Sequence, residues 1–256
     1  MPSVPYQGST LYFEDMGEGT PLVFLHPPGM GRIVFSKQHT LAKHFRLIIP
    51  DLSGHGDSPS FKTFVSLDSY AEEINFLLDH LKLSTCVLIG YSAGGVIAQE
   101  FASLFKNKVC ALILIGAYPK VIHNKLKLMH LAGMKLVRNH PVRLAKIISK
   151  AHTKSKMERK ELLLHMNKAN PEIWYHFYKQ SLYYDGIEKM NRCKLPLLLI
   201  YGEKSDWLND QMECYKDCHP KKVYIIPGAS HQIPTLHHDA LNAILLGEVE
   251  ELLNEN

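Results

Sequence analysis

A serine between glycines is the residue best placed to do chemistry in this sequence. Ser92 lies in the segment Gly90–Gly95, after the apolar run Cys86–Ile89 and before a helix-compatible stretch that continues from Val96. This pattern predicts a buried strand, a sharp turn with the serine at its tip, and a helix. Such a turn exposes the hydroxyl as a nucleophile. The backbone N–H of Ala93, at the start of the helix, would donate to the oxygen that gains charge.

Two further side chains complete the set that a serine nucleophile requires. A serine hydroxyl needs a general base, and the base needs an acid that orients it. His231 follows the last predicted strand, and Asp206 follows the strand before it. The order serine, acid, histidine, each after a strand, is the order expected on a mainly parallel sheet. Glu203 and Asp210 flank Asp206 and remain alternatives for the acid.

The loop at residues 26–31 is expected to supply a second donor to the same oxygen. Its two consecutive prolines have no N–H, which leaves Gly29 or Met30 as the source. The alternative is a rigid turn, with Ala93 donating alone. The residues that we take as candidates for the substrate pocket are His26, Met30, Tyr91 and Trp207.

The elements that must position these residues alternate between strand and helix. Amphipathic spacing predicts a helix over about Ser69–Leu81 with Asp68 or Ser69 as its N-cap, and Val34–His44 is also compatible with a helix. Helices are further predicted around Asp210–Cys218 and over Ala240–Leu253. The buried apolar runs that predict strands are Leu11–Met16, Pro21–Leu25, Phe45–Ile49, Cys86–Ile89, Val109–Ile115, Leu195–Tyr201 and Lys222–Ile226. The alternation predicts an α/β fold with a mainly parallel sheet.

Residues 119–192 interrupt this alternation. They are rich in Lys, His, Met and aromatic residues at helical spacing, and they contain no clear strand. We interpret them as an inserted helical cap, with the core formed by residues 1–118 and 193–256. The cap holds 16 Lys and Arg against 5 Asp and Glu, in a chain of net charge +4. This charge favours solvated helix faces or, alternatively, attraction of an anionic substrate, an acyl-carrier protein or an acidic membrane surface.

Composition excludes several classes of protein. The 256 residues are 46% hydrophobic and 21% charged, as in a globular protein with a large core. No apolar run is long enough to span a membrane, and the first residues lack the pattern of a signal peptide, so a cytoplasmic location is expected. Five cysteines argue against a disulfide framework. Cys214, Cys218 and His219 lack the second ligand pair of a structural zinc site, so no metal is predicted. No nucleic-acid-binding module is present.

Five motifs together resemble the α/β-hydrolase superfamily over nearly the whole chain: Gly90–Gly94, His26–Gly29, Gly54–Ser58, Gly202–Asp206 and Gly228–His231. The resemblance implies an eight-stranded, mostly parallel sheet with an antiparallel second strand and a cap after strand six. One departure stands out. The family usually has His-Gly where this chain has His26-Pro27, so the residue in the donor position of the oxyanion hole is Pro28, which has no N–H.

The expected activity is that of a cofactor-independent serine hydrolase. Its substrate would be a small carboxylic ester, thioester or lactone, cleaved through an acyl-enzyme on Ser92. Carbon–carbon bond hydrolysis and a peroxidase-type reaction are alternatives on the same fold. A ligand-binding receptor or scaffold with vestigial hydrolase activity is the alternative from another class.

Overall fold

An eight-stranded sheet forms the centre of the computed structural model, which describes residues 1–60, 62–218 and 221–254 and, for Asp206, the backbone alone. The strand order is β1-β2-β4-β3-β5-β6-β7-β8. β2 is antiparallel to both of its neighbours, and the remaining pairs are parallel. The strands are β1 (Ser3–Tyr6), β2 (Ser9–Met16), β3 (Pro21–Leu25), β4 (Arg46–Pro50), β5 (Cys86–Tyr91), β6 (Val109–Ile115), β7 (Leu197–Gly202) and β8 (Lys221–Ile226). The predicted mostly parallel sheet with an antiparallel second strand is confirmed.

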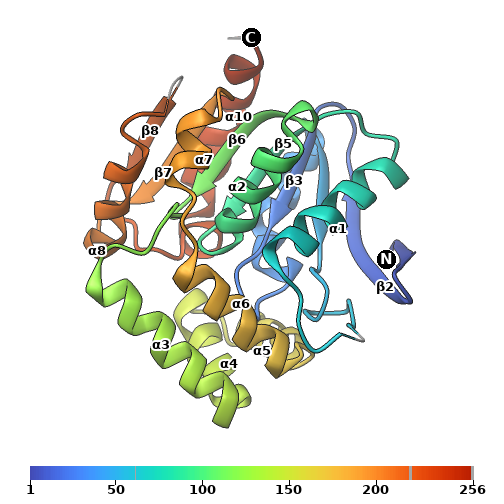
Figure 1. Cartoon of the computed structure of the whole chain (residues 1–256), viewed down its shortest axis with the longest axis vertical. Helices are drawn as coiled ribbons and strands as arrows, with labels where there is room; N and C mark the ends of the chain where they lie inside the picture. Colours follow the sequence, from blue (N-terminus) through green and yellow to red (C-terminus); the bar gives the residue numbers. More distant parts are fainter. Residues whose placement is uncertain (61, 219–220, 255–256) are drawn as a thin grey trace.

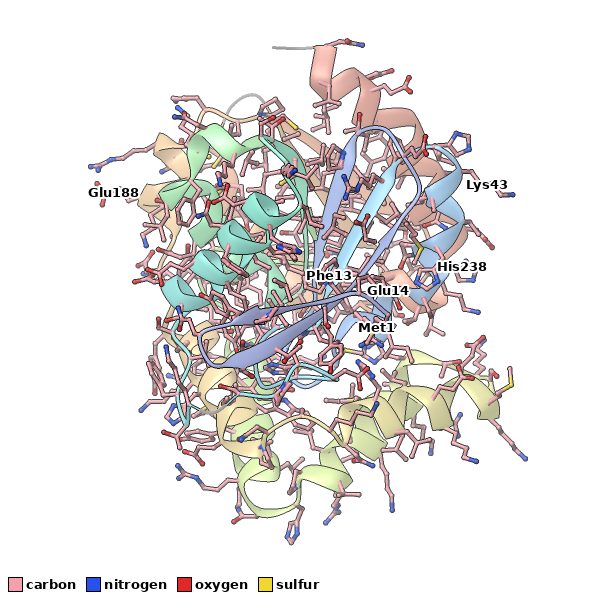
Figure 2. The ribbon with its side chains drawn as sticks, turned by 90° about the vertical axis from the view of Figure 1, so that its right-hand side faces the viewer. Met1, Phe13, Glu14, Lys43, Glu188 and His238 are labelled. Atoms are coloured by element: carbon pink, nitrogen blue, oxygen red, sulfur yellow. The ribbon has the colours of Figure 1, made fainter. Side chains whose placement is uncertain are left out.

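Helices cover both faces of the sheet, as Figure 2 shows edge-on. α1 (Leu67–His80), α2 (Gly94–Leu104) and α7 (Ile187–Arg192) lie on one face, and η1 (Arg32–Lys43) and α10 (His238–Asn254) lie on the other. Central strands are therefore buried on both sides. Leu88 of β5 belongs to the core under α1 and α2, whereas Ile89 belongs to the core under η1 and α10. This two-sided burial explains why these strands are continuous apolar runs in the sequence.

A helical segment follows β6, as the resemblance implied. It contains α3 (Asn124–Asn139), α4 (Pro141–His152), α5 (Lys156–Met166) and α6 (Pro171–Tyr183), which lie together beyond one end of the sheet (Figure 1). The remaining elements are η2 (Lys106–Lys108), α8 (Asp206–Asn209), η3 (Asp210–Tyr215) and α9 (Ile233–Leu236). Among the described residues, no helix is both long and apolar enough to cross a membrane.

Local signals misplaced two element boundaries. α1 begins at Leu67, and the Ser66 side chain accepts a hydrogen bond from the N–H of Ser69, so the prediction of Asp68 or Ser69 as N-cap is wrong. Ser66 takes this role because its hydroxyl reaches the N–H of the third helical residue. The stretch predicted as a helix from Val34 is a 3₁₀ helix that already starts at Arg32.

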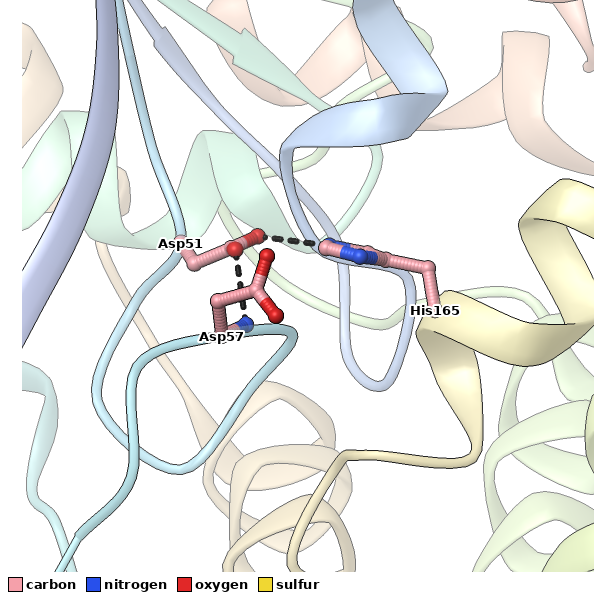
Figure 3. Close-up of side chains that lie close together, drawn as sticks. All are labelled: Asp51, Asp57 and His165. Atoms are coloured by element: carbon pink, nitrogen blue, oxygen red, sulfur yellow. Dashed lines mark hydrogen bonds and ion pairs between the residues drawn. The ribbon is translucent and has the colours of Figure 1, made fainter. Parts of the chain in front are cut away.

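A buried carboxylate fastens the helical segment to the sheet. Asp51, directly after β4, is fully buried. One of its oxygens lies 2.9 Å from Nε2 of His165 in α5, and the other accepts from the N–H of Asp57 at 2.9 Å (Figure 3). The N–H of Arg32 donates to Asp51 at 2.7 Å, and the Arg32 guanidinium pairs with the same carboxylate.

These partners keep the Asp51 carboxyl ionised. Burial opposes ionisation, but the hydrogen bond from His165 and the charges of His165 and Arg32 outweigh it and hold the pKa of Asp51 well below its usual range. A buried charge that is satisfied in this way becomes costly when one partner is removed. The network therefore couples the placement of α5 to the stability of the core.

Replacing Asp51 tests this coupling. Asp51→Ala removes the fully buried carboxylate that Arg32 and His165 share, so we expect the free energy of unfolding to fall by about 3–5 kcal/mol in urea titrations. Asp79→Ala, which breaks the more exposed pair with Lys108, serves as the control and should cost about 1 kcal/mol or less. A loss of that small size in Asp51→Ala would contradict the account.

The same network predicts how the free energy of unfolding changes at acidic pH. Because the folded-state pKa of Asp51 lies below its unfolded value of 3.8, its contribution is present above that value and is lost as the pH falls below it. Asp51→Asn should therefore be less stable than the parent chain at neutral pH, and its stability should fall less steeply with acid.

Candidate active site

The turn between β5 and α2 holds Ser92 in a strained conformation. Its φ is +53°, in the left-handed region that residues with a Cβ rarely adopt. The N–H of Ser92 donates to the carbonyl of Ile115 at 2.8 Å, which ties the turn to the end of β6. A Cβ at Gly94 would overlap the backbone carbonyl of Leu25, and a Cβ at Gly90 would overlap Gly95. The glycines thus allow the close approach that the turn requires.

His231 meets the serine at this turn. Its Nε2 lies 3.0 Å from Oγ of Ser92, within hydrogen-bonding distance for a nucleophile and its base. Burial, with a smaller contribution from the neighbouring His152, lowers the pKa of His231 to about 3. The ring is therefore neutral at physiological pH, which a general base requires. If Nε2 accepts from the serine hydroxyl, Nδ1 carries the ring proton.

The loop after β7 reaches the same histidine. The Trp207 ring lies 5.6 Å from the His231 ring, centroid to centroid. The N–H of Lys204 donates to the carbonyl of Ala229 at 2.8 Å, so the loops after β7 and β8 are hydrogen-bonded to each other. Asp206 begins α8 in this loop, and its side chain lies outside the described part of the chain. Among the described residues, none accepts a hydrogen bond from Nδ1 of His231.

The two alternative acids are engaged elsewhere. Glu203 accepts a hydrogen bond from the N–H of Gly228 at 2.7 Å. Asp210 lies 3.5 Å from Nε2 of His123 and is mostly exposed. At the end of β6, where a competing acid would stand, Gly116 lies against the imidazole: a Cβ there would be 2.8 Å from Nδ1 of His231. The glycine leaves that side of the ring open to an acid from another loop.

The loop at residues 26–31 is a tight turn against the helical segment. The N–H of Met30 donates to the carbonyl of Pro27 at 3.3 Å. Gly29 has φ +78°, and a Cβ there would overlap the ring of Trp174 in α6. No described residue accepts from the N–H of Gly29 or of Ala93. These two N–H groups therefore have no partner within the described part of the chain.

A cavity of about 240 Å³ opens onto the serine. Of the predicted pocket residues, Met30, Tyr91 and Trp207 line it, together with Ser92 and His231. His26 does not, and its assignment to the pocket is corrected: the ring is fully buried and accepts from the N–H of Leu52 at 3.0 Å. The turn directs the His26 side chain into the core, where its hydrogen bond with Leu52 fixes the segment after β4.

Sequence reasoning missed two histidines in the cavity wall. His130 and His152 come from α3 and α4, and each Nδ1 lies 2.9 Å from the carbonyl four residues earlier. That carbonyl can only accept, so Nε2 is left as an acceptor. Tyr118 donates to His130 at 2.7 Å, and the Tyr91 hydroxyl lies 3.2 Å from both Nε2 of His152 and the carbonyl of His231. Spacing alone marked these histidines only as part of a helical face.

The described part of the cavity wall carries no formal charge. Its other members are mainly apolar, and none of the described lining residues is Asp, Glu, Lys or Arg. Burial lowers the pKa of His130 and lowers that of His152 to about 4, so both rings are neutral. The polar groups of the wall are largely satisfied by one another, and the surface offered to a ligand is mostly hydrocarbon.

One cluster of potential metal ligands lies outside the cavity. Ligand atoms of Asp51, Asp57 and His165 lie within 4.8 Å of one another. The cationic side chains of Arg32 and Lys168 already pair with the two carboxylates. The donor set is therefore neutralised by the protein itself, and we interpret it as a structural network. Cys214 and Cys218 are free thiols, and His219 lies outside the described residues.

Comparison with known proteins agrees with this geometry. A family model described as the alpha/beta hydrolase fold matches residues 20–146. The chain is 34% identical over 116 residues to the pimeloyl-[acyl-carrier protein] methyl ester esterase of Chromobacterium violaceum, covering 45% of this chain and 44% of that protein. The chain thus spans less than half the length of this relative. It is 26% identical over 244 residues to the sn-1-specific diacylglycerol lipase ABHD11 of Danio rerio, covering 86% and 75% of the two chains.

A solved structure matches the whole chain. It comes from a study of carboxylesterases of the archaeon Nitrososphaera gargenis and superposes with a TM-score of 0.85 at 19% identity, covering 100% of both chains. At this identity the likeness shows the fold. The family match agrees with three features of the structure. These are the order of the strands, the strained turn at the serine after β5, and the helical segment after β6. This chain has the α/β-hydrolase fold.

Proposed function

We propose that this chain is a cofactor-independent serine hydrolase that cleaves a small, uncharged carboxylic ester, thioester or lactone. The observation that carries the proposal is the 3.0 Å contact between Oγ of Ser92 and Nε2 of His231, at the wall of an apolar cavity. The relatives named above act on esters by their printed names, which supports an ester as the scissile group.

The reaction follows from the positions of these atoms. Ser92 attacks the substrate carbonyl while Nε2 of His231 takes its proton, and His231 then gives this proton to the leaving alcohol, thiol or lactone oxygen. Water hydrolyses the acyl-enzyme by the same route in reverse. The N–H groups of Ala93 and Gly29 would stabilise the oxyanion. We prefer Gly29 to Met30 because the N–H of Met30 is already used in the turn.

Asp206 is proposed as the acid of the triad. Glu203 and Asp210 have other partners. The two residues after Asp206 lie close to the imidazole, because Trp207 contacts His231 and Leu208 lies against Gly116. A carboxylate at Nδ1 would orient the imidazole and stabilise its charged form.

The absence of charge among the described residues of the wall supports an uncharged substrate. Burying a carboxylate or phosphate against it would cost free energy without a compensating partner. This argues against anionic substrates inside the cavity, and against carbon–carbon hydrolysis of substrates with a terminal carboxylate. A ligand-binding receptor remains the alternative from another class, and it predicts an unreactive serine.

The reactivity of Ser92 separates these alternatives. A fluorophosphonate probe should label the parent chain, and Ser92→Ala should abolish both labelling and ester hydrolysis. Ser103→Ala, an exposed serine of the same helix α2, is the control and should behave as the parent. A parent chain that binds short esters but is never labelled would support the receptor instead.

Replacing each acid in turn tests the triad. Asp206→Asn should lower kcat by about 10³–10⁴-fold. It should also shift the acid limb of the kcat/KM profile to lower pH, because a lost negative charge lowers the pKa of His231. Glu203→Gln and Asp210→Asn are the matched controls and should leave the limb in place. A shift of the limb in either control, with Asp206→Asn unchanged, would reassign the acid.

A matched pair of substrates tests the uncharged cavity. The p-nitrophenyl esters of butyrate and of succinate have equal carbon number and differ by one terminal carboxylate. We expect kcat/KM to be at least about tenfold lower for the succinate ester, equivalent to about 1.4 kcal/mol or more of lost transition-state binding. Equal values, or a preference for succinate, would show that a cation reaches the bound acyl group.

A further inference from the structure

Helices α3 and α4 expose hydrocarbon side chains to solvent around the cavity. The exposed apolar residues are Leu128, Met129 and Leu131 of α3, and Val142 and Ile147 of α4. Leu128 is 65% exposed and Ile147 50%. Single exposed apolar residues are common on protein surfaces, but five of them on two helices that pack against each other are a candidate interaction site. We call these five residues and the cationic side chains of the same two helices the α3–α4 face.

This face borders the cavity. Met129 and Ile147 are exposed and also line the cavity that contains Ser92. They come from different helices, so both α3 and α4 contribute to the part of the wall that reaches solvent, which we take as the mouth. Leu128 adjoins Met129, and Lys146 and Lys150 lie one residue before and three residues after Ile147 on α4. A molecule that enters the cavity there passes hydrocarbon side chains flanked by cations.

The charge of the two helices has one sign. Their residues include seven Lys and Arg and no Asp or Glu. The whole chain carries only +4, whereas residues 119–192 hold 16 Lys and Arg against 5 Asp and Glu. The remainder of the chain is therefore net negative. In Figure 1, α3 and α4 lie at the end of the molecule opposite α10, so their seven Lys and Arg residues belong to elements at one end.

We propose that the α3–α4 face docks on an anionic lipid bilayer, with the mouth of the cavity turned toward the lipid. Exposed hydrocarbon bordered by lysines suits the boundary between acyl chains and head groups, because lysine stems can lie along the hydrocarbon while their ammonium groups reach the phosphates. Anionic lipids attract such clusters of lysine and arginine. The docked cavity then opens directly to molecules dissolved in the membrane.

This orientation identifies the source of the substrate. The wall of the cavity is uncharged and mostly hydrocarbon, whereas the surface around its mouth is cationic. The cations therefore attract the surface in which the substrate is dissolved, and the cavity accepts a neutral lipophilic ester from it. The inference about the substrate rests on the proposed function, whereas the docking on the bilayer does not.

Vesicle binding tests the docking without turnover. The Ser92→Ala chain is sedimented with vesicles of phosphatidylcholine, alone or mixed with phosphatidylserine. We expect partition onto the anionic vesicles to be at least about tenfold stronger, and to weaken as salt is added. Equal partition onto both vesicles, or none onto either, would overturn the proposal.

Substitutions in the Ser92→Ala chain then test the lysines and the exposed apolar residues of the α3–α4 face separately. Lys146→Gln/Lys150→Gln and Leu128→Ser/Val142→Ser should each weaken binding to anionic vesicles at least about fivefold. Lys106→Gln/Lys194→Gln is the matched control, because these exposed lysines precede β6 and β7 at the other end of the sheet. An equal loss in the control would show that only overall charge matters.

The same substitutions in the active chain separate docking from catalysis. Hydrolysis of a water-soluble ester should be unchanged by the two α3–α4 pairs, whereas hydrolysis of an ester dissolved in anionic vesicles should fall at least about fivefold. Docking with no hydrolysis of either ester would contradict the proposed function and leave the docking intact. Lysine-dependent binding to an acidic acyl-carrier protein, without vesicle binding, would replace the lipid surface by a protein partner.

Discussion

The strained backbone at Ser92 is the constraint on which the site depends. A left-handed φ at a residue with a Cβ costs on the order of 1–3 kcal/mol, and it persists only where the surroundings enforce it. Here they do so from two sides. The N–H of Ser92 is held by the carbonyl of Ile115, and Gly90 and Gly94 allow strand and helix to close on the turn. Ser92 therefore projects from the junction of two buried elements and not from a flexible loop.

The partner of the serine is placed by the same sheet. Parallel strands end at one edge, so the loops after β5, β6, β7 and β8 converge there. Gly116 makes room for the imidazole of His231, and a Cβ at Gly202 would come within 2.6 Å of the carbonyl of Ala229. Small residues at these strand ends let four loops share one space. Helices α3, α4 and α6 then cover this edge and supply part of the cavity wall.

Local signals in the sequence were sufficient for seven of the eight strands and for the turn at Ser92, whereas β1 and the antiparallel direction of β2 were not predicted from local signals. Strands buried on both faces appear as apolar runs, and the glycines around Ser92 reflect close backbone contacts, so both can be recognised without tertiary information. The residues of α3 and α4 that face the cavity could not be predicted. The hydrogen-bond partners of His130 and His152 are tyrosines that lie elsewhere in the sequence. The buried role of His26 was missed for the same reason.

Two further features depend on contacts between distant segments. The carboxylate of Asp51 is stabilised by His165, which lies over a hundred residues away, and no local pattern connects them. The mouth of the cavity is likewise formed by residues of two different helices, so a list of basic and apolar residues could indicate a charged cap but not its orientation. The structure shows where these basic and apolar residues lie relative to Ser92.

The most direct test of the central claim is to trap the acyl-enzyme. The chain is mixed with p-nitrophenyl butyrate, quenched in acid within the first turnover and digested for peptide mass spectrometry. The account predicts one butyryl group on the peptide that contains Ser92, formed with a stoichiometric burst of p-nitrophenol. Turnover without any acylated peptide, or a butyryl group on a different residue, would contradict it.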